Sequence, residues 1–156
     1  MGIKAASGTK LYIGGVAASL SQVLADYQND SYIEVGEVED LGAFGDESTE
    51  ITFDSLSRGR TLKLKGTRNA GNMPVTVGDD TTDEGQIAME AAEGTKFDYN
   101  FYIELPDAET IGGENSKHYF AGKVMSKRRN VGTANNVIRR NFSVGINSDI
   151  VETEPT

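Results

Sequence analysis

The chain has 156 residues and a formal net charge of −9 at pH 7, and its length is sufficient for one domain with its own hydrophobic core. It contains no cysteine and one histidine, His118, which excludes disulfides, thiolate metal sites and multi-histidine metal sites within a single chain. The excess of acidic residues argues against tight nonspecific binding of nucleic acid, because such binding requires basic residues that neutralise phosphates.

The predicted elements are mostly β-strands, because apolar and polar residues alternate along most of the chain. In chain order, the alternating segments are 31–39, 50–56, 61–66, 72–78, 97–105, 118–125 and 137–146. Within the first of these, the apolar phase slips after Val35, and we expect a β-bulge at Gly36. Eighteen glycines against three prolines also favour an all-β protein with many turns.

One helix is predicted after the segment 72–78. Thr81 and Glu84 have the spacing of a capping box, and Gly94 can take the left-handed conformation that often follows a helix. Between them lies an apolar stripe suited to packing on a sheet, formed by Ile87, Ala88, Ala91 and Ala92. The predicted fold is therefore mainly β, a β-sandwich or barrel with one short flanking α-helix.

Acidic and basic residues are segregated along the chain. Residues 11–57 contain ten acids and no lysine or arginine, whereas residues 58–68 contain five basic residues and no acid. Seven more basic residues, again without an acid, lie between positions 116 and 148. Acidic and basic strands could pair within one subunit, or opposite charges of different copies could meet and produce rings or filaments. Charge alone favours pairing within the subunit.

Motifs for catalysis or metal binding are missing from the sequence. The acidic segment 40–50 lacks the spacing of a calcium-binding loop. No serine lies in a G-x-S-x-G motif, and His118 is better explained as a residue at a strand start than as a general base. We therefore expect no enzyme activity and no catalytic, cofactor or metal site.

Several segments together resemble the tail tube proteins of long-tailed, noncontractile bacteriophages, also called major tail proteins. They are GTKLYIGG (8–15), EVGEVEDLGAFGDES (34–48), LKGTRNAG (64–71) and NVGTANNVIRRNFSVGINSDIV (130–151), with the predicted helix between the last two. The resemblance runs from about residue 8 to residue 151. None of these segments is a chemical motif, so the specificity of the match lies in their number and order.

The resemblance implies one tail tube domain over residues 1–156, with an N-terminal arm (1–8) and a C-terminal arm (148–156). Such proteins assemble into sixfold rings that stack into a tube, and each subunit contributes strands to a continuous inner β-barrel. A long loop and the chain termini reach adjoining rings. We expect both arms to be ordered mainly by neighbouring subunits.

The resemblance also implies the partners and the location of the protein. The partners would be other copies of the chain, a tape-measure protein, and tail terminator and distal tail proteins. DNA would pass through the bore without specific binding, and no membrane or cofactor would be involved. The protein would be assembled in the host cytoplasm and reside in the virion tail. The alternatives are a ring protein of a type VI secretion-like system and, in a different class, a β-sandwich glycan-binding or decoration module.

Two sets of residues are candidates for roles in such an assembly. The candidates for contacts between subunits carry opposite charges in extended or loop-like segments, and they are Asp40, Asp46, Glu47, Glu50, Lys127, Arg128, Arg129 and Arg140. The candidates for the bore lining lie on the polar faces of two predicted strands, and they are Glu34, Glu37, Glu39, Arg139, Asn141 and Ser143.

Arg140 stands out because it occupies the apolar row of its predicted strand, between Ile138 and Phe142. A charge buried there would be costly without a partner. We therefore expect Arg140 to have an acidic partner. An acid of another subunit is favoured, and an acid of the same chain is the alternative.

Overall fold

The computed structural model describes residues 2–156, so that Met1 of the expected N-terminal arm lies outside the described residues. In chain order the elements are β1 (Lys10–Val16), α1 (Leu24–Gln28), β2 (Ile33–Val35), β3 (Val38–Asp40), β4 (Glu47–Ser55), β5 (Arg60–Asn69), β6 (Asn72–Gly78), α2 (Glu84–Glu93), β7 (Tyr99–Glu104), β8 (Lys117–Asn130), β9 (Arg139–Ile146) and β10 (Val151–Thr153).

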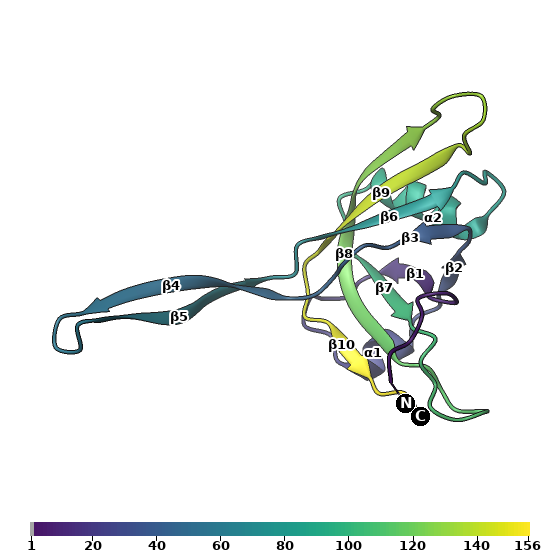
Figure 1. The fold of residues 1–156 in the computed structure, drawn as a ribbon. Coiled ribbons are helices and arrows are strands. Elements are labelled where there is room, and N and C mark those ends of the chain that lie inside the picture. Colours follow the sequence, from purple (N-terminus) through teal and green to yellow (C-terminus); the bar gives the residue numbers. More distant parts are fainter. Residues whose placement is uncertain (1) are drawn as a thin grey trace.

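One antiparallel sheet forms the body of the molecule and curls upon itself (Figure 1). Its strand order is β2-β1-β7-β8-β9-β6-β3, and β10 adds to β8 beside β9. Strands β2 and β3 lie at opposite ends of this order, yet only Gly36 and Glu37 separate them in the chain. Because two residues span roughly 7 Å at most, the two ends of the sheet must lie close together, as in an open barrel.

The connection between β2 and β3 corrects the prediction of a bulge at Gly36. The chain does not continue along one strand there but crosses from one edge of the sheet to the other. Glu37 makes the crossing with a positive φ of 57°, and its carbonyl accepts a hydrogen bond of 2.9 Å from the amide of Gly78. The slip in the apolar phase was therefore a correct signal of an irregularity, but it marks a change of strand.

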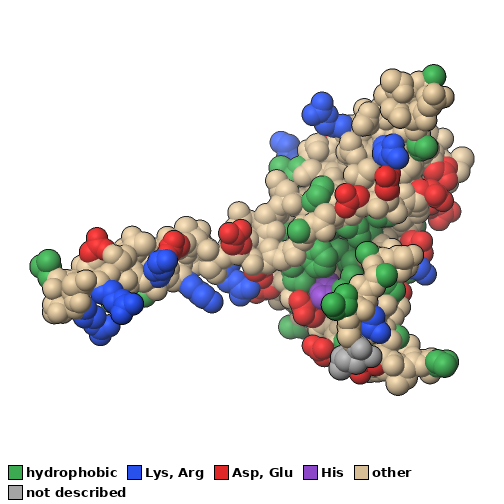
Figure 2. Space-filling view, in the orientation of Figure 1, with side chains coloured by type: hydrophobic (Ala, Val, Ile, Leu, Met, Phe, Trp, Pro, Cys, Tyr) green, Lys and Arg blue, Asp and Glu red, His purple; other side chains and the backbone are tan. Residues whose placement is uncertain are grey.

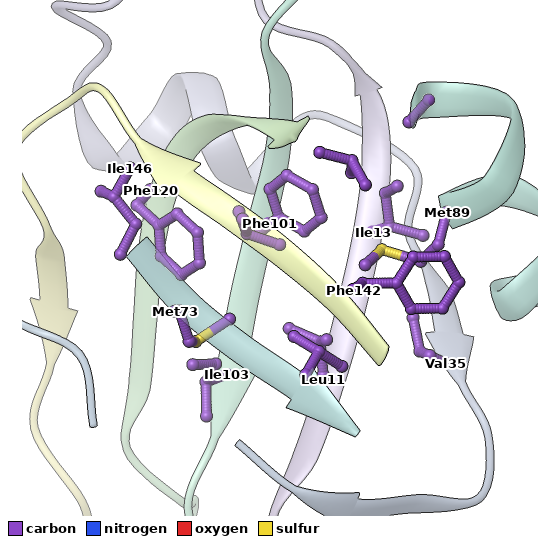
Figure 3. Packing of buried hydrophobic residues seen from close by; sticks show 14 of the residues in the cluster. Leu11, Ile13, Val35, Met73, Met89, Phe101, Ile103, Phe120, Phe142 and Ile146 are labelled. Carbon is purple, nitrogen blue, oxygen red and sulfur yellow. The ribbon is translucent and has the colours of Figure 1, made fainter. Parts of the chain in front are cut away.

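The hydrophobic core fills the inside of the curled sheet (Figure 3). Phe101 and Ile103 of β7, together with Phe142 and Val144 of β9, belong to it, as the alternation of their segments predicts. Phe120 of β8 stacks on Phe101, with ring centroids 5.5 Å apart. One face of each central strand is therefore apolar and buried, and its other face points out of the barrel.

Helix α2 holds the crossing between β2 and β3. Its N-cap is Asp83, whose carboxylate accepts hydrogen bonds from the amides of Gln86 (3.0 Å) and Gly36 (2.9 Å). The buried Gln86 side chain donates to the carbonyl oxygens of Gly36 (3.1 Å) and Gly78 (2.9 Å). A Cβ atom at Gly85 would lie 2.1 Å from the carbonyl oxygen of Glu34, so this contact requires glycine.

Three expectations about this helix were wrong in detail. The N-cap is Asp83 instead of Thr81. Gly94 has a φ of −72° and therefore a right-handed conformation, where a left-handed one was expected. Ala88 and Ala92 of the predicted stripe do pack on the core, but Ile87 is half exposed and the buried Met89 was missed. Asp83 also accepts a hydrogen bond from the distant Gly36, a contact that local spacing cannot reveal, although its spacing to Gln86 is that of an N-cap.

A second helix, α1, was not predicted. It is only five residues long, and it packs on the outer face of β8, where Tyr27 stacks on Tyr119 with ring centroids 5.8 Å apart. Strand β10 pairs with β8 next to this cluster, with Val151 opposite Tyr119. These residues of the expected C-terminal arm are therefore ordered by their own chain, which corrects the expectation that neighbours order them.

Candidate assembly surfaces

Strands β4 and β5 form a two-stranded hairpin, here called the arm, that projects away from the body (Figure 1). The register places Ile51 opposite Leu64 and Phe53 opposite Leu62, so these four apolar side chains share one face. Phe53 is 59% exposed and Leu64 is 56% exposed. An isolated two-stranded hairpin is marginally stable in water. The arm therefore presents an apolar face that its own chain does not cover.

The charges of the arm partly pair across its two strands. Arg68 lies 2.6 Å from Asp46, and Lys63 lies 3.5 Å from Glu50. Glu47 makes no ion pair within residues 2–156. The predicted acidic segment 40–50 and the first basic window are thus neighbours within one subunit over this stretch. Figure 2 shows basic side chains along one side of the arm and acidic ones along the other.

Arg140 forms the centre of an ionic cluster in the body, although only 2% of its surface is exposed. Its guanidinium group pairs with Asp79, which follows β6, and lies 3.2 Å from Glu90 of α2. Lys127 lies 3.1 Å from Glu90, and Arg129 lies 3.2 Å from Asp79. The cluster therefore links β8, β9 and α2 through charged hydrogen bonds.

The electrostatics of the two carboxylates follow from these contacts. Burial would raise the pKa of Asp79, but hydrogen bonds from Arg140 and Arg129 outweigh this effect and hold the pKa below its ordinary value. The hydrogen bond from Lys127 lowers the pKa of Glu90, with Arg140 and Arg129 adding to it against a smaller effect of burial. Both acids are therefore ionised near neutral pH.

This cluster decides how Arg140 is accommodated. The expected acidic partner exists, but it belongs to the same chain, so the favoured intersubunit partner was wrong. Lys127 and Arg129 also have partners in their own chain. Arg128, in contrast, is exposed and forms no ion pair in the described part of the chain. Asp79 was missed as a partner because it lies outside the predicted strands, 61 residues before Arg140.

The candidates for the bore lining are brought together only in part. Asn141 of β9 lies opposite Thr76 of β6 and Arg128 of β8, and Ser143 lies opposite Pro74 and Ser126. These residues form the outer face of β6, β9 and the second half of β8, here called the polar face. Arg139 shares the parity of Asn141 and pairs with Glu39 of β3.

The two remaining candidates lie elsewhere. Glu34 is on β2, opposite Tyr12 of β1, at the other end of the strand order from β3. Glu37 lies at the crossing between β2 and β3, and its side chain is exposed. The prediction treated 31–39 as one strand, so it could not separate Glu34 from Glu39.

A groove of about 480 Å³ lies between β3 with its following loop and residues 6–9. Its lining includes Val38, Asp40, Leu41, Phe44 and Leu105. Figure 2 shows hydrophobic side chains gathered beside the histidine on this part of the surface.

The ring of His118 packs edge-on against Phe44, with centroids 5.6 Å apart. Its Nδ1 atom lies 3.4 Å from a carboxylate oxygen of Glu152, but neither ring nitrogen makes a hydrogen bond. The groove is thus lined in part by apolar side chains, and His118 packs behind one of them, Phe44.

Within residues 2–156, no group of three histidine, cysteine or acidic side chains is arranged to hold a metal ion. No helix in this range has the length and apolar character that a membrane span requires.

No protein-family model matches the chain, and no curated protein matches it. Solved structures do match. A chain of the anti-feeding prophage baseplate aligns with a TM-score of 0.71 at 10% identity, over 99% of this chain and 98% of that chain. The tail tube of SPP1 aligns with a TM-score of 0.64 at 14% identity, over 94% and 76% of the two chains. The chain has a tail tube fold.

A third match is to a structure from the end of such a tube. The sheath/tube terminator structure of an extracellular contractile injection system aligns with a TM-score of 0.66 at 11% identity, over 98% of both chains. The predicted mainly β fold class is therefore confirmed. At these identities the likeness establishes the fold alone.

Proposed function

We propose that this chain is a structural, non-catalytic subunit that assembles with copies of itself into stacked rings of a tail-type tube. The observation that carries the proposal is the arm, whose apolar face, including Phe53, has no cover within the chain. Exposed apolar surface of this kind marks a protein contact. The tail tube fold, shared with the SPP1 tail tube, supplies the kind of assembly.

The polar face of β6, β9 and β8 is our candidate for the bore of the tube. Its serine, threonine and asparagine side chains are neutral and Arg139 is paired with Glu39, so within residues 2–156 Arg128 is the one unpaired charge that these residues offer to passing DNA. We propose that DNA moves along it without specific binding. We also propose that the strands of neighbouring subunits continue one barrel around the bore.

Contacts between subunits would use charges that the chain leaves unpaired. Asp40, Glu47 and Arg128 have no ion pair within residues 2–156 and remain candidates from the original set. Because each exposed pair contributes only about 0–1 kcal/mol, such pairs would set orientation more than strength.

Further features belong to the proposal through the resemblance to noncontractile phage tails. Sixfold rings are consistent with the sixfold-symmetrised baseplate structure. We propose a tape-measure protein inside the tube, terminator and distal proteins at its ends, assembly in the host cytoplasm and a final place in the virion. The single domain would span residues 1–156.

A ring protein of a contractile or type VI secretion-like system is the second candidate. It is favoured by the matches to contractile injection systems and by an Hcp protein, which aligns with a TM-score of 0.51 at 10% identity over 94% of this chain and 98% of that chain. Labelling native particles with an antibody against the chain separates the two. Signal along a flexible, unsheathed tail supports the phage proposal, and signal inside a contracting sheath supports the alternative.

Electron microscopy of the purified full chain at increasing concentration tests the proposal itself. We expect rings or tubes with a central bore, accompanied by the loss of monomer in size-exclusion chromatography. A chain that stays folded and monomeric at every concentration, even when an extract that contains the tube-end proteins is added, would contradict the proposed function.

A further inference from the structure

Strand β10 itself contributes few contacts to the sheet. It is three residues long and pairs with β8 alone, with Glu152 opposite His118. The hydroxyl of Thr153 accepts one further hydrogen bond, of 3.0 Å, from the amide of Lys117. Short segments with few contacts open more readily than the strands of the core. One additional interaction can therefore decide how firmly β10 stays paired.

His118 lies next to β10 in a place where its ring is poorly satisfied. Only 14% of its side chain is exposed, and neither ring nitrogen makes a hydrogen bond. Buried polar atoms nearly always have partners. A neutral imidazole has one N–H donor and one acceptor, whereas a protonated imidazole has two donors and a positive charge. A carboxylate at this place therefore suits the protonated ring and not the neutral one.

Two carboxylates face the ring. Glu152 has an oxygen 3.4 Å from Nδ1, and its side chain is 59% exposed. Asp107, in the loop after β7, accepts hydrogen bonds from the amide (2.8 Å) and the hydroxyl (2.5 Å) of Ser116. Burial would raise the pKa of Asp107, but these hydrogen bonds, with a smaller contribution from His118, hold it below its ordinary value. Asp107 is therefore a fixed negative charge near the ring.

The other neighbours of the ring carry no charge. Ile103 of β7 lies opposite His118 in the sheet, and Phe44 packs against the ring from the loop after β3. Lys117 and Tyr119 are adjacent to His118 on β8, so their side chains point to the other face of the sheet. Within residues 2–156, neither Glu152 nor Asp107 pairs with a lysine or arginine. Both acids are therefore available to a proton on the ring.

The two acids differ in their dependence on β10. Asp107 stays near the ring whether β10 is paired or not, whereas Glu152 reaches the ring only while β10 lies beside β8. We propose that His118 and Glu152 form a pH-dependent clasp, in which the protonated ring holds β10 on β8 and loss of the proton loosens it. The clasp lies within one chain and does not depend on the proposed function.

The sign of the pH dependence follows from the two charges. In model peptides, glutamate side chains lose their proton near pH 4 and imidazoles lose theirs near pH 6.5. The clasp is therefore strongest between these values. It is lost as the pH rises and the ring becomes neutral, and it is lost again as the pH falls and Glu152 becomes neutral. Because Glu152 is more than half exposed, solvent screens the pair, and we expect it to change the opening of β10 by about two- to fivefold.

Hydrogen exchange of the full chain, kept dilute so that it stays unassembled, tests the clasp. The protection factors of the β10 amides, relative to those of β6, should be about two- to fivefold higher at about pH 5.5 than at about pH 8. Glu152→Gln should remove this difference. The matched control is Glu154→Gln, which removes the same charge from an exposed residue without an ion pair in residues 2–156, and it should keep the difference.

A titration of the His118 ring by nuclear magnetic resonance gives the reciprocal measurement. If protonation strengthens the pairing of β10, the pairing strengthens proton binding by a similar factor. Glu152→Gln should therefore weaken proton binding by the ring about two- to fivefold, and Glu154→Gln should not. Protection of β10 that is independent of pH in the unsubstituted chain, or a pH dependence that survives in Glu152→Gln, would overturn the proposal. So would equal proton binding in the two variants. None of these results affects the proposed function, which the assembly experiment tests separately.

Discussion

The body of this chain buries a charged side chain and pairs it, whereas the arm leaves apolar side chains exposed to water. In the body, the arginine in an apolar row is enclosed and is paired with Asp79 and Glu90 of the same chain. In the arm, apolar side chains such as Phe53 remain in solvent although nothing in the chain covers them. The buried charge of the body is therefore satisfied within one chain, whereas the apolar face of the arm is not covered within it. This difference separates residues that the fold requires from residues that the proposed assembly would use.

Removing the arm should have the largest effect on assembly and little effect on folding. If residues 47–69 are replaced by a short glycine-serine linker, the body should keep its fold, because the arm pairs only with itself. The urea concentration at which half of the body is unfolded should change little, whereas the formation of rings and tubes should be lost entirely. Electron microscopy and urea denaturation of the same preparation measure both effects. A linker variant that unfolds would show that the arm is part of the fold after all.

Arg140→Met should have the largest effect on the isolated chain. The substitution leaves Asp79 and Glu90 without their central partner, and breaking a buried ion pair from one side costs about 3–5 kcal/mol. Because Arg129 and Lys127 still contact these acids, we expect the lower end, about 3 kcal/mol. Urea denaturation measures the loss of the free energy of unfolding.

The matched control for this variant is Arg128→Met. Arg128 has the same charge and lies on the adjacent strand, but it is exposed and forms no ion pair within residues 2–156. Its substitution should change the free energy of unfolding by less than about 0.5 kcal/mol. Equal losses for the two variants would show that the cluster around Arg140 does not stabilise the body.

The sequence predicted the body better than it predicted the contacts between distant elements. The alternation in 97–105 and 137–146 placed Phe101 and Phe142 in the core, because one buried face is a local property of a strand. The same alternation in 50–56 and 61–66 identified two strands, but their apolar residues are exposed. Periodicity reveals a face that must be covered and does not reveal whether the cover belongs to the same chain.

The partner of Arg140 illustrates what the sequence could not predict about the candidate surfaces. The need for an acid followed from its position, but choosing Asp79 and Glu90 required the path of the chain after β6 and the position of α2. The split of 31–39 into β2 and β3 likewise depended on Gln86 and Asp83, which lie about 50 residues later. Such contacts arise from tertiary structure, so a local pattern can indicate that a contact is needed but does not identify the partner.

A change of pH should show how much of the stability supplied by the cluster depends on ionised Asp79 and Glu90. The pKa values of Asp79 and Glu90 are lowered in the folded chain, so their stabilising effect is complete above the ordinary carboxyl pKa of about 4 and is lost as the pH falls through the lowered values. The difference in free energy of unfolding between the unsubstituted chain and Arg140→Met should therefore shrink below about pH 4. Urea denaturation at pH 7 and pH 3 measures it. A difference that stays constant would exclude ionisation of these acids as its source.

The smallest expected effect is that of Arg128, which lies beside Arg129 on the same strand, β8. Arg128 and Arg129 are neighbours on β8, but successive side chains of a strand point to opposite faces, so only Arg129 reaches Asp79. Arg129→Glu should therefore destabilise the monomer, because it places an acid beside Asp79. Arg128→Glu should leave the monomer unchanged and raise the concentration needed for assembly only a few-fold, since an exposed pair contributes about 0–1 kcal/mol. That increase should disappear in high salt, which screens exposed charges. Light scattering across a salt series measures it, and a salt-independent defect would place Arg128 in a packed contact in place of an electrostatic one.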